Sequence, residues 1–135
     1  MIEASLYNYF MADTIITDRV SVYITQAPVD AKMPWLVILP TPTEINRISK
    51  NKMEEKDFVR IIVDYPASDT NGAGRFVAER AKVLVENYRG DMGDTVDLFI
   101  GCGGVSSFPG MNGSYRYQFD VNARFTYDRL TPPFV

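Results

Sequence analysis

Residues 115–128 alternate between apolar and polar side chains without a break. Successive side chains of a β-strand point to opposite faces of a sheet, so this period of two predicts one long strand. Such a strand far exceeds the usual length of about five to six residues. Its apolar face must lie against a core, and its polar face must meet water or another chain. The polar face carries Arg116, Gln118, Asp120, Asn122 and Arg124.

Weaker patterns predict the remaining elements. Apolar residues at helical spacing indicate helices over residues 2–12 and 74–89, with Gly90 as the C-terminal cap of the second. Four further strands are predicted over residues 20–24, 35–39, 58–65 and 96–100. This order favours an α+β fold, a two-layer arrangement in which two helices pack on a mostly antiparallel β-sheet of about five strands. The length is that of one domain, so we expect a single domain over residues 1–135.

A long loop is expected over residues 43–56, which are polar and charged and show no period. Loops of this length are uncommon in compact domains, and many are functional or become ordered on binding. We therefore treat its charged residues as candidates for an interface with another subunit or partner. Phe134, in the apolar segment Pro132–Val135, is a further candidate. The candidates in the loop are Arg47, Lys50, Lys52, Glu54 and Glu55.

The residue content argues against several kinds of site. With no histidine and one cysteine, Cys102, the sequence has no Ser-His or Cys-His pair, no Cys/His zinc site and no internal disulfide. A formal net charge of −3 argues against a specific nucleic-acid partner held by phosphate contacts. There is no basic leader, and no apolar run approaches the ~20 residues of a membrane span. We expect a soluble, non-enzymatic protein with no cofactor, metal or membrane partner, made in a reducing cytosol.

Four patterns suggest chemistry, and each has a simpler structural interpretation. Gly72-Ala73-Gly74 lacks the lysine and hydroxyl residue of a phosphate-binding loop. The cysteine of Gly101-Cys102-Gly103-Gly104 has no histidine to activate it. The aromatic residues of 115–119, which suggest RNA stacking, share the face of Val121 and Ala123, the expected core face. No motif spacing relates the strand carboxylates Asp57, Asp64, Asp120 and Asp128.

Short motifs in a fixed order run along nearly the whole chain. They comprise the N-terminal helix, Val22-Tyr23, Gln26-Ala27-Pro28, Met33–Val37, Val59–Tyr65, a helix with Ala78, Ala81 and Val85, and the strand Tyr115–Tyr127. In this order they resemble the tail terminator proteins of long-tailed bacteriophages, also called tail completion or head–tail joining proteins. The glycine-rich stretch 101–113 departs from that family's pattern.

The resemblance implies a structural virion protein rather than an enzyme. Tail terminators form a ring, usually a hexamer, on the head-proximal end of the tail tube, where the ring stops tube polymerisation and joins the tail to the head connector. The implied partners are further copies of the chain, the tail tube protein and the connector or stopper protein. The implied location is the neck of the virion, after synthesis in the host cytoplasm. Two alternatives stay open: another neck protein such as the stopper, or a small RNA- or ligand-binding module.

Overall fold

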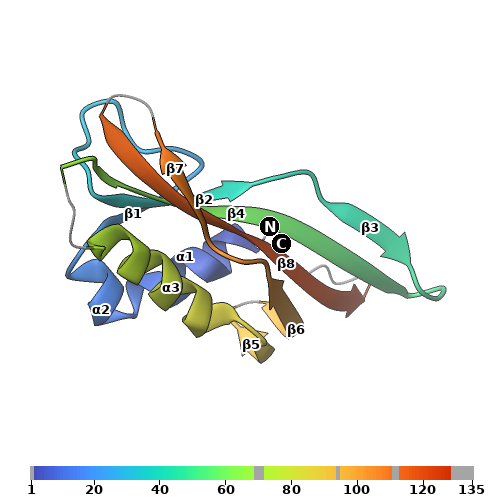
Figure 1. Cartoon of the computed structure of the whole chain (residues 1–135). Helices are drawn as coiled ribbons and strands as arrows, with labels where there is room; N and C mark the ends of the chain where they lie inside the picture. The colour runs from blue at the N-terminus through green and yellow to red at the C-terminus, as the bar shows by residue number, and fades with distance from the viewer. Residues whose placement is uncertain (1, 69–71, 94, 111–112, 129–135) are drawn as a thin grey trace.

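Two very long strands form the centre of the molecule. The computed structural model describes residues 2–68, 72–93, 95–110 and 113–128 (Figure 1). In chain order the elements are α1 (Glu3–Met11), α2 (Thr14–Thr17), β1 (Ser21–Ile24), β2 (Trp35–Pro40), β3 (Glu44–Arg47), β4 (Lys52–Pro66), α3 (Ala73–Val85), β5 (Arg89–Met92), β6 (Thr95–Cys102), β7 (Ser106–Pro109) and β8 (Ser114–Asp128). The strands β4 and β8 have 15 residues each and pair antiparallel over their whole length.

The sheet extends to both sides of this central pair. Its order is β1-β2-β4-β8-β6-β5, while β3 pairs with β4 and β7 pairs with β8. The pairing of β1 with β2 is parallel, and every other pairing is antiparallel. The predicted α+β class is therefore confirmed. The described part of the chain holds eight strands instead of about five, because β3, β5 and β7 escaped prediction.

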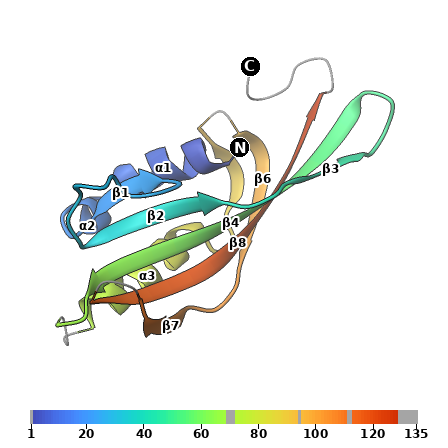
Figure 2. The ribbon, with the colours of Figure 1, turned by 90° about the horizontal axis from the view of Figure 1, so that it is seen from above.

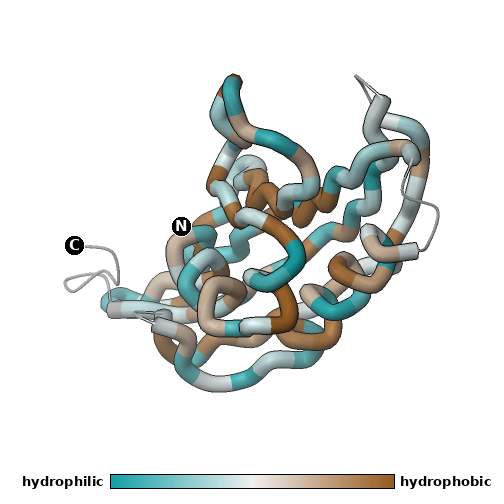
Figure 3. Tube along the Cα trace, turned by 90° about the vertical axis from the view of Figure 1, so that its left-hand side faces the viewer, coloured by the Kyte–Doolittle hydropathy of each residue, from teal (hydrophilic) through white to brown (hydrophobic). Residues whose placement is uncertain are grey.

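The helices cover one face of the sheet (Figure 1). As predicted, Phe119, Val121, Ala123 and Phe125 of β8 point into the core, together with alternate residues of β4. The helices contribute the buried apolar side chains Leu6, Phe10, Ile16, Val77, Ala78, Ala81 and Val85. Each large apolar side chain buried here stabilises the fold by about 1.5–3 kcal/mol. Hydrophobic segments, brown in Figure 3, run through the middle of the molecule.

The close packing of α3 on the sheet depends on a glycine. A Cβ atom on Gly74 would lie 2.5 Å from the ring of Tyr117 on β8. This close approach explains the glycine better than phosphate binding does. At its other end, α3 ends at Val85, and the chain turns through Asn87 in the left-handed region. The prediction that Gly90 caps the helix is wrong, because Gly90 belongs to β5.

A three-stranded arm projects beyond the helices (Figure 2). We define the arm as β3, residues 48–51, residues 52–55 of β4 and residues 125–128 of β8. The pairing of β6 with β8 ends at Arg124, so the outer part of β8 pairs only with β4. The prediction of a loop over residues 43–56 is therefore wrong. Both faces of this hairpin are largely polar, so its sequence lacks the alternation that marks a half-buried strand.

Two carboxyl groups are buried where the arm joins the body. Glu55 is 3% exposed and Asp57 is 1% exposed, and both lie on the side of the sheet that carries the helices. The backbone N–H of Ile2 donates to Asp57 Oδ2 over 2.9 Å. Burial raises the pKa of Glu55, and with the hydrogen bond and the charge of Asp57 acting in the same direction it reaches about 7. Glu55 thus belongs to the protein interior, contrary to its predicted place in a solvated loop.

This burial makes stability depend on pH. Between pH 4.5 and about 7 the folded state keeps the Glu55 proton that the unfolded state loses, so the free energy of unfolding falls as the pH rises. Glu55→Gln removes this fall. We expect the variant to be more stable than the wild type at pH 8 and to show a flatter pH dependence in urea unfolding. Glu54→Gln, on the opposite face, is the control; equal slopes for the wild type and Glu55→Gln would contradict the account.

Candidate interaction surface on the open face of the sheet

The face of the sheet opposite the helices is open. Within the described residues no helix covers it (Figure 1). The cross-strand register brings onto this face the five polar residues predicted on the long strand: Arg116, Gln118, Asp120, Asn122 and Arg124. Their partners on β4 are in part apolar, since Gln118 lies opposite Ile62 and Asn122 lies opposite Phe58. The open face is therefore mixed, with apolar and charged side chains side by side.

At the end far from the arm, an ion pair is locked by three hydrogen bonds. Arg116 Nε donates to Asp64 Oδ1 over 2.8 Å, and Arg116 Nη2 donates to Oδ2 over 3.1 Å. Trp35 Nε1 also donates to Asp64 Oδ2, over 2.9 Å. Because Asp64 is only 3% exposed, its charge requires these partners. Asp64 thus links β2, β4 and β8, and Arg116 is less available to a partner than its sequence position suggests.

A groove lies beside this ion pair. Its volume is about 430 Å³, and its walls come from the open face and from residues 25–29, which follow β1. Val37 and Ile62 are its most deeply buried apolar residues, at 6% and 7% exposure. Leu39 and Trp35 are half-buried on the same side, and Val29 is fully exposed on the rim. We call this feature the groove; it is mainly apolar.

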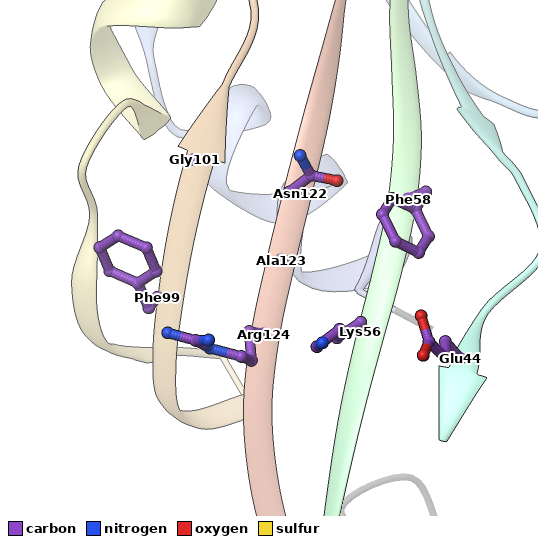
Figure 4. Close-up of a pocket in the computed structure, with 8 residues that line it drawn as sticks. All are labelled: Glu44, Lys56, Phe58, Phe99, Gly101, Asn122, Ala123 and Arg124. Atoms are coloured by element: carbon purple, nitrogen blue, oxygen red, sulfur yellow. The ribbon is translucent and has the colours of Figure 1, made fainter. Parts of the chain in front are cut away.

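Nearer the arm, a hollow of about 400 Å³ combines aromatic and basic side chains (Figure 4). Lys56 and Arg124 are cross-strand partners of like charge, an arrangement that destabilises a sheet unless an anion offsets it. Lys56 lies 3.9 Å from Glu54. The guanidinium of Arg124 lies 5.7 Å from the centre of the Phe99 ring. This hollow is lined by Glu44, Lys56, Phe58, Phe99, Gly101, Asn122, Ala123 and Arg124.

Such a surface has the composition of a protein–protein contact. Phe58 is 38% exposed, so part of its ring is available for contact with another chain. Aromatic and arginine side chains are the residues that most often dominate binding energy at interfaces. In the centre of the face, Arg60 and Asp120 form an exposed ion pair of 2.9 Å that orients both side chains.

The structure separates the other predicted interface residues. Arg47, Lys50 and Lys52 are exposed on the arm, and Glu54 lies half-buried on its open side. Glu55 faces the opposite side, as described above. Phe134 lies outside the described residues. Sequence analysis missed the apolar members of the open face, Trp35, Phe58 and Phe99. A signal existed for Phe58, which is apolar at a position of the strand where alternation calls for a polar residue.

Two features of the described residues argue against a catalytic thiol and a metal site. Burial raises the pKa of the Cys102 thiol to about 11, with a smaller contribution from Glu86, so the thiol is protonated at neutral pH. No group of three Cys, Asp or Glu side chains within residues 2–68, 72–93, 95–110 and 113–128 is arranged to hold a metal ion. Among these same residues, no helix has the length and hydrophobicity needed to cross a membrane.

The structure thus defines an α+β chain with one helix-covered face and one open, mixed face. A chain in the virion of a native gene transfer agent (GTA) particle has the same fold, with a TM-score of 0.74. The match covers 93% of this chain and 95% of that chain, at 12% sequence identity. At this identity the likeness establishes the fold alone. No protein-family model and no curated protein match the sequence.

The two ion pairs of the open face should differ in their effect on stability. Arg116→Ala leaves the buried Asp64 carboxylate without its cation and should lower the free energy of unfolding by ~3–5 kcal/mol. Arg60→Ala removes an exposed pair and should cost less than about 1 kcal/mol. Urea unfolding of both variants at pH 7 measures the difference. Equal effects would show that Asp64 does not depend on Arg116.

Proposed function

We propose that this chain is a tail terminator subunit that forms a ring, a hexamer in keeping with the family it resembles, at the head-proximal end of a phage tail tube. The fold it shares with a virion chain, over nearly the full length of both, is the observation that carries the proposal. The order of motifs in the sequence points independently to the same class of virion protein. In this role the ring stops tube polymerisation and joins the tail to the head connector.

The open face and the arm supply surfaces suited to this assembly. A head-to-tail ring needs two different patches on each subunit, and the rotation between them closes the ring. The like-charged cross-strand pair of Lys56 and Arg124 and the exposed Phe58 favour contact with another protein. The remaining surfaces then serve the tail tube protein on one side and the connector or stopper on the other. We place the assembled ring in the neck of the virion, after synthesis in the host cytoplasm.

Two other functions compete with this one. A stopper or another neck protein would share the virion location and differ in its neighbours. A small RNA- or ligand-binding module is favoured by one observation, the exposed Phe58 and the Phe99 ring beside Lys56 and Arg124 (Figure 4). Binding to single-stranded RNA that weakens steeply with salt would support this second class.

Two measurements test the proposal: the mass of the purified protein in solution, and negative-stain imaging of tail tubes mixed with the protein. We expect closed rings on one end of tubes assembled from the tail tube protein, seen by negative-stain imaging, and a narrower distribution of tube lengths. Lys56→Glu with Arg124→Glu should abolish ring formation. Arg75→Glu, on the exposed side of α3, is the matched control and should leave rings intact. A wild-type chain that stays monomeric and leaves tube length unchanged would contradict the proposal.

A further inference from the structure

The arm carries two isoleucines that no described residue buries. Ile45 is 51% exposed and Ile48 is 57% exposed. Ile45 is the cross-strand partner of Glu55, so it points to the side of the sheet that carries the helices. Met53 and Tyr127, which are also paired across strands, share that side of the arm. The underside of the arm, defined as Ile45, Arg47, Met53 and Tyr127, therefore carries three apolar or aromatic side chains and one arginine past the body.

The groove has the opposite orientation and lies at the opposite end. Its inner residues, Val37, Leu39 and Ile62, point to the open side of the sheet. Along β4 the groove lies level with residues 60–64, whereas the arm begins at Glu55. At about 3.4 Å per residue the two features are on the order of 20 Å apart. They also face opposite ways, so the arm of one copy does not reach its own groove.

The underside of the arm and the groove can face each other when a second copy is displaced along the direction of β4 and β8 without being turned over. The underside of one arm then faces the open side of the next copy, as overlapping tiles do. The other apolar patch of the body, around Phe76 and Val83 on α3, points to the same side as Ile45. Contact between that patch and an arm would require the second copy to be turned over.

We propose that the arm of one copy lies across the groove of the next copy, with Ile45 against Val37, Leu39 and Ile62. This inference rests on the proposed assembly of several copies and names the contact that joins them. Each copy offers one arm and one groove, so the contact is heterologous and repeats from copy to copy until the ring closes. Arg47, the cross-strand partner of Met53, lies on the same side as Ile45, and its long side chain would reach the edge of the contact and keep its charge in solvent.

Cross-linking between copies tests the contact. The chain would carry Ile45→Cys on the arm and Gln26→Cys on the rim of the groove, in a Cys102→Ala background that leaves no other thiol. A short bis-maleimide cross-linker should convert assembled protein into a ladder of dimers, trimers and larger species. Within one copy the two positions are too far apart and on opposite faces, so a ladder reports contact between copies.

A matched variant carries Ile45→Cys and Val83→Cys, which places the second thiol on the helix patch. We expect no ladder from this variant. Ile45→Asp should in addition weaken association by on the order of tenfold or more, with unchanged thermal unfolding of the monomer. Rings that form without a ladder from the Ile45/Gln26 pair, or with one from the Ile45/Val83 pair, would overturn the inference and leave the proposed function standing. A chain that never associates would overturn both.

Discussion

The full-length antiparallel pairing of β4 with β8 is the interaction on which the rest of the structure depends. Fifteen residue pairs, from Lys52 with Asp128 to Pro66 with Ser114, join these two strands. The same ribbon carries the core on one side, the open face on the other and the arm at one end. Since backbone hydrogen bonds within this ribbon need no particular side chains, the polar arm continues the sheet after the core has ended.

The buried carboxyl groups mark the boundary between body and arm. Glu55 and Asp57 occupy positions on β4 where the body has apolar residues such as Val59 and Ile61. A carboxyl group that keeps its proton up to neutral pH behaves there as a polar but uncharged residue. The packing of these two carboxyl groups therefore links the arm to the body. This coupling bears on assembly, because the arm carries one half of the proposed contact between copies.

The sequence predicts an element well where one face of that strand or helix is buried and the other is exposed. The strand 115–128 was predicted nearly to its ends because its odd-numbered residues pack on helices along most of its length. The four-residue strand Ser106–Pro109 is exposed throughout and depends on backbone pairing with β8, which leaves no periodic signal. The five polar residues of the open face were predicted as neighbours, but Trp35, Phe58 and Phe99 join them only through pairing between distant strands. Asp57 likewise accepts its hydrogen bond from the distant backbone N–H of Ile2.

The proposed function depends on contacts that the open face and the arm make with other protein chains. Imaging by cryo-electron microscopy of tail tubes mixed with the protein tests that claim most directly. The account predicts a closed ring on one end of the tube, with each arm resting on the open side of the next copy. Tubes whose ends carry no ring, or a ring whose copies meet through their helix-covered faces with the arms free, would contradict it.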